Sequence, residues 1–231
     1  MPTVYVQFTD STQVAVKAVF GCPQDTSVYP NQGALESTDA RYLQFLDPSL
    51  IPMTLAQAQA AQLAALSAAC AAAIVGGFAS LALGATHTYP SKITDQQNLA
   101  SSVLDSVMAK ASPGWAASTQ YDAGTIRVSS TGVPYKCVSA GTSGAAAPAW
   151  PTAPGTIVND GTAQWQLWTT PFWCADAGGN WAWTDHSADQ IQTVGRDIKA
   201  AILACQAKNA QLAAQVAAAT TVAAVQAITW N

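Results

Sequence analysis

The first 21 residues alternate between apolar and polar positions with a period of two, as strands with one buried face do. Val4, Val6 and Phe8 form the apolar side of the first run. Every second residue from Val14 to Phe20 forms the apolar side of a second run. Turn-forming residues at 9–12 separate the two runs. This segment predicts a β-hairpin. Residues 22–52 contain four prolines and predict loops, with one helical turn at 39–46.

A helical period replaces the period of two in three later segments, at 54–75, 95–111 and 187–218. Each segment begins with a hydroxyl residue followed three positions later by glutamine, which is the pattern of a capping box. The pairs are Thr54 with Gln57, Thr94 with Gln97, and Ser187 with Gln190. Because Gly76-Gly77 follows the first segment and Pro113-Gly114 the second, we expect helices that end at those points.

Apolar side chains at spacings of three, four and seven mark one face of each predicted helix. The expected buried positions are Leu63, Leu66, Cys70 and Ile74, then Leu99, Val103 and Val107, then Ile191, Val194, Ile198, Ile202, Cys205, Leu212 and Val216. The third helix would be about 48 Å long, so a break near Asn209 is also open. Abundant alanine lets helices approach closely and predicts a tight bundle.

Helical periodicity disappears between residues 116 and 170, where Gly, Pro, Ser and Thr become frequent. Turn signals stand at Thr131-Gly132, Ser143-Gly144, Pro154-Gly155 and Asp160-Gly161. We expect a small all-β module inserted between helices, and therefore an α+β protein with an N-terminal β-hairpin and an Ala-rich helical bundle. The expected domains are an attachment or oligomerisation region at 1–52, a helical scaffold at 53–115 and 171–231, and the module at 116–170.

The chain of 231 residues is poor in charge. Charged residues make up 10%, against ~25% in an average soluble protein. Nine basic residues face 13 acidic ones and form no cluster, which excludes a nucleic-acid binder that works by neutralising phosphates. A surface with so little charge is expected to be covered by partners, including further copies of the same chain.

The cysteines and the N-terminal residues show no sign of a secreted or zinc-binding protein. The five cysteines include no CxxC pair, which argues against a disulfide framework or a zinc site. No secretory signal is expected at the N-terminus.

The 23 residues from Leu63 to Ala85 are long enough to span a membrane. Their many alanines, Gly76 and Gly77, and the single nearby base Lys92 argue against such a span.

Two groups of residues resemble a known family. The first comprises Phe78-Ala79-Ser80, Leu83-Gly84, Tyr89-Pro90, Asp95-Gln96 and Asn98-Leu99, and the second Trp181, His186–Ile191, Val194-Gly195 and Ile228-Thr229-Trp230. This pattern resembles an uncharacterised helical domain of tailed-bacteriophage tail and tail-fibre proteins. The front end, with Phe20–Pro23 and 39–46, resembles the part that accompanies it. The family has no defined chemistry, so the resemblance implies a place in a virion rather than a reaction.

The inserted segment resembles small aromatic modules that recur in phage tail proteins and are loosely similar to carbohydrate-binding modules of chitinases. The residues are Tyr121, Gly124, Gly132, Tyr135, Cys137, Gly141–Gly144, Pro148, Trp150, Pro151, Asp160–Thr162 and Trp165. Sugars stack on aromatic faces. The expected glycan contacts are Trp150, Tyr121 and Trp168, with Trp150 the most exposed because it lies in a proline-bounded loop. Tyr135 and Trp165 are expected in the core of the module.

Catalytic readings of the sequence are weak. Asp185-His186-Ser187 contains the residue types of a hydrolase triad, but Ser187 fits a helix N-cap, and triads are assembled in space. We expect His186 to bond a backbone carbonyl or to pack against Trp181 or Trp183. Asp176 and Asp185 leave a glycosidase pair open. No catalytic residue, metal site or cofactor is expected.

The function expected from these patterns is that of a non-enzymatic structural component of a bacteriophage tail, in a tail fibre or near the baseplate, located in the virion. The expected partners are other tail proteins, further copies of the chain as a trimer, and a host surface glycan reached through the β module. The alternatives are a tail-fibre assembly chaperone, a membrane protein such as a holin, and an enzyme that cleaves cell-wall material or polysaccharide.

Overall fold

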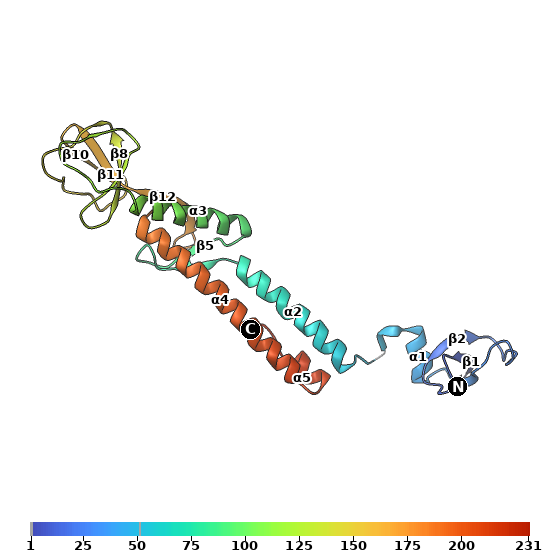
Figure 1. Ribbon diagram of the computed structural model, residues 1–231. Coiled ribbons are helices and arrows are strands. Elements are labelled where there is room, and N and C mark those ends of the chain that lie inside the picture. Colours follow the sequence, from blue (N-terminus) through green and yellow to red (C-terminus); the bar gives the residue numbers. More distant parts are fainter. Residues whose placement is uncertain (1, 51) are drawn as a thin grey trace. The chain divides into compact units, whose positions relative to one another are not determined.

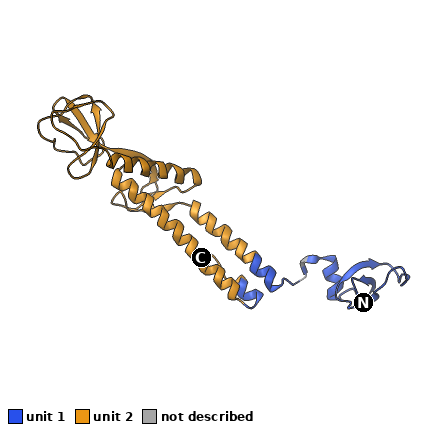
Figure 2. Ribbon diagram, in the orientation of Figure 1, with its two compact units in different colours: residues 1–60, 220–225 blue, residues 61–219, 226–231 orange. Residues whose placement is uncertain are grey.

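The computed structural model describes residues 2–50 and 52–231 and has an α+β fold (Figure 1). The chain forms two compact units, residues 1–60 with 220–225 and residues 61–219 with 226–231 (Figure 2). Helix α2 (Leu55–Val75) begins in the first unit and ends in the second, and the short helix α5 is Val222–Gln226. The inserted module and most of the predicted scaffold fall within the second compact unit, whereas residues 53–60 and 220–225 of the predicted scaffold belong to the first.

The N-terminal unit is a small antiparallel sheet with the strand order β2-β1-β3. Its strands are β1 (Thr3–Phe8), β2 (Val16–Phe20) and β3 (Gln32–Glu36), followed by α1 (Ala40–Leu46) and the 3-10 turn η1 (Pro48–Leu50). The predicted hairpin and helical turn are confirmed, whereas the third strand was not expected. Val6, Phe8 and Leu35 form its core. Gly33 leaves room for the Phe8 ring, because a Cβ there would lie 2.7 Å from a ring carbon.

The three predicted helices are present as α2, α3 (Ile93–Lys110) and α4 (Ala188–Ala218). Thr54 and Ser187 cap their helices as expected, since their hydroxyls accept the backbone N–H groups of Gln57 and Gln190. The side-chain oxygens of the two glutamines accept the backbone N–H groups of Thr54 and Ser187 in turn. The predicted cap at Thr94 is wrong. Helix α3 begins earlier, and the Asp95 carboxylate accepts the backbone N–H of Lys92 at 3.0 Å. The break near Asn209 does not occur, since α4 continues through that residue.

A four-stranded sheet lies against α3 and α4 in the second unit. Its strands are β4 (Phe78–Ser80), β5 (His87–Tyr89), β12 (Thr169–Ala175) and β13 (Trp181–Ser187), in the order β13-β12-β5-β4. Phe78, Tyr89 and Phe172 pack with Leu99, Ile191 and Val194 in the main core. The strands β12 and β13 are not among the elements that the sequence pattern predicts. The inserted module follows α3 in the chain and is followed by β12 of this sheet.

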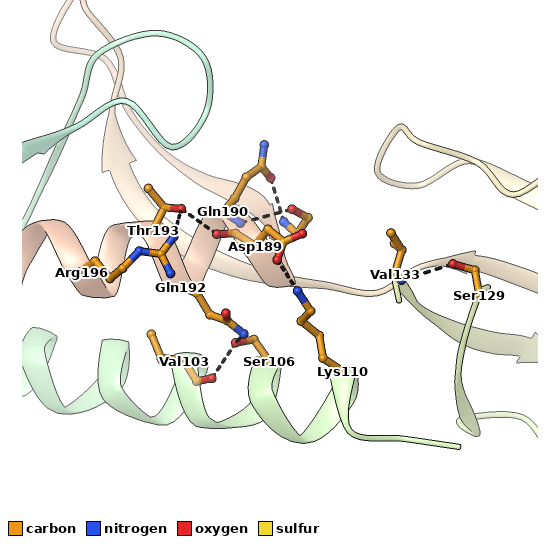
Figure 3. Close-up of polar contacts among 11 residues, drawn as sticks. Val103, Ser106, Lys110, Ser129, Val133, Asp189, Gln190, Gln192, Thr193 and Arg196 are labelled. Carbon is orange, nitrogen blue, oxygen red and sulfur yellow. Dashed lines mark hydrogen bonds and ion pairs between the residues drawn. The ribbon is translucent and has the colours of Figure 1, made fainter. Parts of the chain in front are cut away.

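Helices α3 and α4 approach each other closely (Figure 3). A Cβ at Gly195 would lie 2.7 Å from Cγ2 of Val103, so only glycine permits this spacing without movement. Gln192 donates to the Ser106 hydroxyl at 3.1 Å, and Lys110 pairs with Asp189. The expected buried face of α3 is only partly correct, because Ser102 and Ser106 are buried while Val107 is exposed.

The stripe expected on α4 holds best in its first three turns, where Ile191, Val194 and Ile198 are buried. Toward the C-terminus Val216 is buried as well, whereas Ile202, Cys205 and Leu212 are half-buried. On α2, Leu66 and Cys70 are buried, Ile74 is half-buried and Leu63 is exposed. The apolar stripes of α2 and α4 are therefore less buried than the sequence pattern indicates.

The inserted module is all β, as predicted, with its own core. Its strands are β6 (Gln120–Tyr121), β7 (Ile126–Val128), β8 (Pro134–Ser139), β9 (Gly141–Thr142), β10 (Ile157–Asp160) and β11 (Ala163–Leu167). They form a four-stranded sheet in the order β10-β11-β8-β7 and the pair β6-β9. Gly132, Gly155 and Gly161 adopt positive φ at predicted turns. Tyr135 and Trp165 lie in the core, as expected.

One helix among the described residues, α2, is long and apolar enough to cross a membrane by length and composition. The uncharged stretch from Leu63 to Ala85 is not one helix, because α2 ends at Val75 and β4 follows after Gly76-Gly77. A soluble protein can contain a helix of this kind, so the finding is weak evidence for a membrane span.

Candidate functional site

Tyr121, one of the three expected glycan contacts, is buried in the β module. Its side chain is 3% exposed, and its hydroxyl accepts the backbone N–H of Ala116 at 2.8 Å and donates to the carbonyl of the same residue. The guanidinium of Arg127 lies over the ring, 5.1 Å from its centroid. An edge contact with Trp165 occupies another side of the ring. The phenol therefore ties the start of the module to its core.

Trp150 is half-buried and does not stand clear of its loop as expected. Its ring stacks on Tyr135 with 4.3 Å between centroids and lies edge-on to Trp165 and Trp115. The expectation that the proline-bounded loop leaves Trp150 exposed is wrong. A module of this size has few large apolar residues, so the Trp150 ring packs into its core although it comes from a loop.

Trp168 lies apart from this cluster, at the junction between the module and α3. It lines a cavity of about 380 Å³ together with Met108, Ala109, Ser112 and Ile126. Tyr121 and Trp150 both contact Trp165, whereas Trp168 contributes to this separate cavity. The structure therefore does not gather the three expected residues on one surface.

Three other tryptophans gather on the outer face of the β12–β13 hairpin. Trp173 pairs with Trp183 across the two strands, and Trp181 pairs with Ala175 two positions further along. Their exposed fractions are 37% for Trp173, 45% for Trp181 and 65% for Trp183. The rings of Trp173 and Trp181 are stacked, with centroids 6.1 Å apart and planes at 18°. We call these three residues the tryptophan surface.

The pleat of the two strands explains why these rings face outward. Successive side chains in a strand point to opposite faces. Phe172, Cys174 and His186 point into the main core, so Trp173, Trp181 and Trp183 point away from it. Asp185 is exposed at the position two residues after Trp183 and so shares its face. The period of two over 181–187 was the signal that could have revealed this surface.

The turn of the hairpin is held by Asp176. Its carboxylate accepts backbone N–H groups of Gly178 and Asn180 at 2.8 and 2.9 Å, and the Asn180 amide also donates to it. The hydrogen bonds from Asn180, followed by that from Gly178, lower the pKa of this carboxyl. A turn fixed in this way sets the register of the strands and hence the spacing of the tryptophan rings.

Asp185, His186 and Ser187 do not form a triad. His186 is buried, and its Nε2 accepts the Tyr89 hydroxyl at 2.8 Å while Nδ1 faces the Thr184 carbonyl at 2.8 Å. The bond to a carbonyl was expected, but the packing partner is Tyr89 rather than a tryptophan. The Ser187 hydroxyl accepts the backbone N–H of Gln190 as a helix cap.

Asp176 and Asp185 do not have the spacing of a glycosidase pair. Asp176 follows the last residue of β12, whereas Asp185 pairs with Pro171 near the other end of that strand. At about 3.3 Å per residue they are about 16 Å apart, beyond the ~5 to 9.5 Å used by these enzymes. Within residues 2–50 and 52–231 no three His, Cys, Asp or Glu side chains are grouped to hold a metal ion.

Comparison with known proteins shows that part of the chain is similar to one family model. Residues 38–133 match the family described as a domain of unknown function (DUF4376). The matched range covers a little over two fifths of the chain and runs from the residue before the Asp39 cap of α1 to Val133, before β8. No curated protein and no solved structure matches the chain. The chain is thus similar to this family from α1 through α3 and into the inserted module.

Proposed function

We propose that this protein is a non-enzymatic structural component of a bacteriophage tail, in a tail fibre or near the baseplate, that contacts a glycan on the host surface. The resemblance of residues 78–99 and 181–195 to tail proteins supports the place in the virion. The tryptophan surface of Trp173, Trp181 and Trp183 is the observation that supports the contact with a glycan. The proposed contact therefore moves from Trp150 in the module to the β12–β13 hairpin.

The chemistry of the tryptophan surface fits a pyranose ring. The C–H bonds of one sugar face stack on an indole, whose electron-rich face attracts their partial positive charge. Trp173 and Trp181 present nearly parallel planes, and Trp183 lies at 58° to Trp173 and 5.6 Å from it. The exposed carboxylate of Asp185 on the same face can accept hydrogen bonds from sugar hydroxyls. Stacking and directional acceptors are the usual elements of a small-molecule site.

The expected strength of one such surface is low. A single aromatic stacking contact contributes about 1 kcal/mol. Three rings and a hydrogen bond to Asp185 would together give about 4 kcal/mol, so one copy would bind with a Kd on the order of millimolar. Several copies on one particle would act together and raise the overall affinity by about 100-fold or more. A multicopy tail protein is the setting in which such a weak surface becomes useful.

Binding of purified protein to host envelope polysaccharide tests the contact, with adsorption of whole particles as a second measurement. The variant Trp181→Ala/Trp183→Ala should abolish both while the melting temperature stays within about 3 °C of the parent, because both rings are exposed. Trp150→Ala serves as the matched control and should lower the melting temperature instead. Unchanged adsorption in the double variant would refute the glycan contact.

Mass spectrometry of purified virions tests the place of the protein separately. A structural component should be present at a fixed ratio to known tail proteins. A protein that is abundant in infected cells but missing from finished particles would instead be an assembly chaperone.

A further inference from the structure

Helix α3 carries an apolar stripe on the side that faces away from the main core. Ile93, Leu104, Val107 and Met108 have exposed fractions between 49% and 69%. Residues 93, 97, 100, 104 and 107 are spaced four, three, four and three apart, which is the heptad spacing of coiled coils. The intervening positions of the stripe are Gln97 and Ala100, so no charge interrupts it.

The stripe continues into a groove between α3 and α4. The groove has a volume of about 580 Å³ and is lined by apolar side chains that include Leu99, Val103, Val107, Ile202 and Leu203. Val107 belongs to both the stripe and the groove, and Leu203 is 54% exposed at the far rim. Stripe and groove therefore form one apolar surface on the outside of the helix pair. We call it the α3–α4 surface.

Charged residues of opposite sign border the two sides of the α3–α4 surface. Arg196 and Lys199 line the groove on α4. Asp105 is exposed on α3, where the helical period of 100° per residue places it on the flank that faces away from the groove, at the edge of the cavity lined by Trp168. Neither Asp105 nor Lys199 forms an ion pair in the part of the chain that the structure describes.

The charged groups also lie at similar heights along the two helices. Gln192 bonds to Ser106, and Gly195 lies against Val103, so Thr193 of α4 is level with the turn of α3 that holds Asp105. The Arg196 guanidinium donates to the Thr193 hydroxyl at 2.8 Å and so reaches that level (Figure 3). Arg196 on one side of the surface and Asp105 on the other side therefore lie at the same level along the helix axes.

We propose that the α3–α4 surface binds a second copy of this chain, with the two α3 helices parallel and the symmetry axis running along them. In that arrangement the flank with Asp105 faces the α4 helix of the neighbouring copy, where Arg196 lies at the same height. An antiparallel pair would instead place the two Asp105 flanks on the same side of the seam and leave both acids without a cation. The heptad spacing provides the apolar seam, and the charge pattern favours the parallel arrangement. This inference does not rest on the proposed function.

Sedimentation equilibrium of the full chain tests the self-association. The parent protein should associate, and Leu104→Asp should weaken the association by about 100-fold or more because it places a charge in the apolar seam. The fold should be unaffected, since Leu104 is 59% exposed. Ala204→Asp makes the same charge change at an exposed position of α4 outside the groove and should associate like the parent. A monomeric parent, or a Leu104→Asp variant that still associates, would overturn the proposal.

Charge reversal and cross-linking test the direction. Asp105→Arg and Arg196→Asp should each weaken association about fivefold, and the double variant should restore it. In a Cys22→Ser background, which removes the exposed native thiol, Ile93→Cys and Val107→Cys should both form disulfide-linked dimers on mild oxidation. A parallel seam brings each residue to its own counterpart. Cross-linking at neither position, or at only one, would indicate an antiparallel or different interface.

Discussion

Tyr89 donates its hydroxyl hydrogen to Nε2 of His186 over 2.8 Å in the main core. Nδ1 of the same ring faces the Thr184 carbonyl and so carries the ring proton. Both side chains are fully buried. Burial lowers the pKa of His186 and raises that of Tyr89. Burial therefore favours the neutral imidazole in the folded protein.

We expect the free energy of unfolding to fall as the pH drops below about 6.5. The unfolded chain takes up a proton on His186 near its ordinary pKa of 6.5, while the folded protein resists it. The unfolded state binds more protons in that range, so acid favours unfolding. The contribution is complete above pH 6.5 and is lost toward the lowered pKa of the folded state, at up to about 1.4 kcal/mol per pH unit. Melting curves between pH 7.5 and 5 measure it.

Two variants separate burial from the hydrogen bond. Tyr89→Phe should lower stability by about 1 kcal/mol at every pH and keep the pH slope, because the histidine stays buried. His186→Gln should remove this part of the slope. An unchanged slope in His186→Gln would assign the acid sensitivity to other groups.

Asp160 should be the residue on which the β module most depends. It is 3% exposed, and its carboxylate accepts the indole N–H groups of Trp115 and Trp165 and the backbone N–H of Gly144, at 2.7 to 2.9 Å. Asp160→Ala leaves the buried Trp165 donor and two half-buried donors without this acceptor and should destabilise the module by about 3 kcal/mol. Hydrogen exchange should show faster opening of residues 115–167 while α3 and α4 stay protected. Equal loosening of the helices would show that the module and the helices unfold together.

Gly195→Ala should destabilise the protein despite the better helix propensity of alanine. The gain in propensity is about 0.5–1 kcal/mol, whereas forcing a methyl group 2.7 Å from Val103 costs about 1–3 kcal/mol. In a Val103→Ala background the same change should become stabilising. Urea unfolding of the four proteins in this double-mutant cycle measures the coupling. Additive effects would mean that the helices move apart without cost.

Excision of the module should leave the helical part folded. Ser112 at the end of α3 and Trp168 at the start of β12 line the same cavity, so the two junctions lie close together. Replacing residues 117–169 by a short Gly/Ser linker closes a small gap, which has a low entropic cost. The shortened protein should melt cooperatively. A broad, non-cooperative transition would show that the sheet needs the module in order to form.

The sequence alone determined the elements whose signals are local. The capping boxes at Thr54 and Ser187, the N-terminal hairpin and the turns at Gly132, Gly155 and Gly161 depend on contacts within a few residues, and the structure has them. The turn predicted at Ser143-Gly144 is not formed. The buried Tyr135 and Trp165 followed from their positions in strand-like runs. Local propensity also misled at Thr94, because Asp95 competes successfully for the helix start.

The tertiary structure decided which side chains are exposed. Trp150 and Trp183 are the same residue type, yet the ring of Trp150 packs into the small core of the module, whereas the register of its strand turns Trp183 outward. Apolar residues lie on two faces of α3, and the face with Val103, which contacts α4 at Gly195, is the one that is more deeply buried. Burial depends on partners that are distant in sequence, here 117 residues apart for Ser80 and Asp197. A periodic pattern contains no information about which face those partners meet.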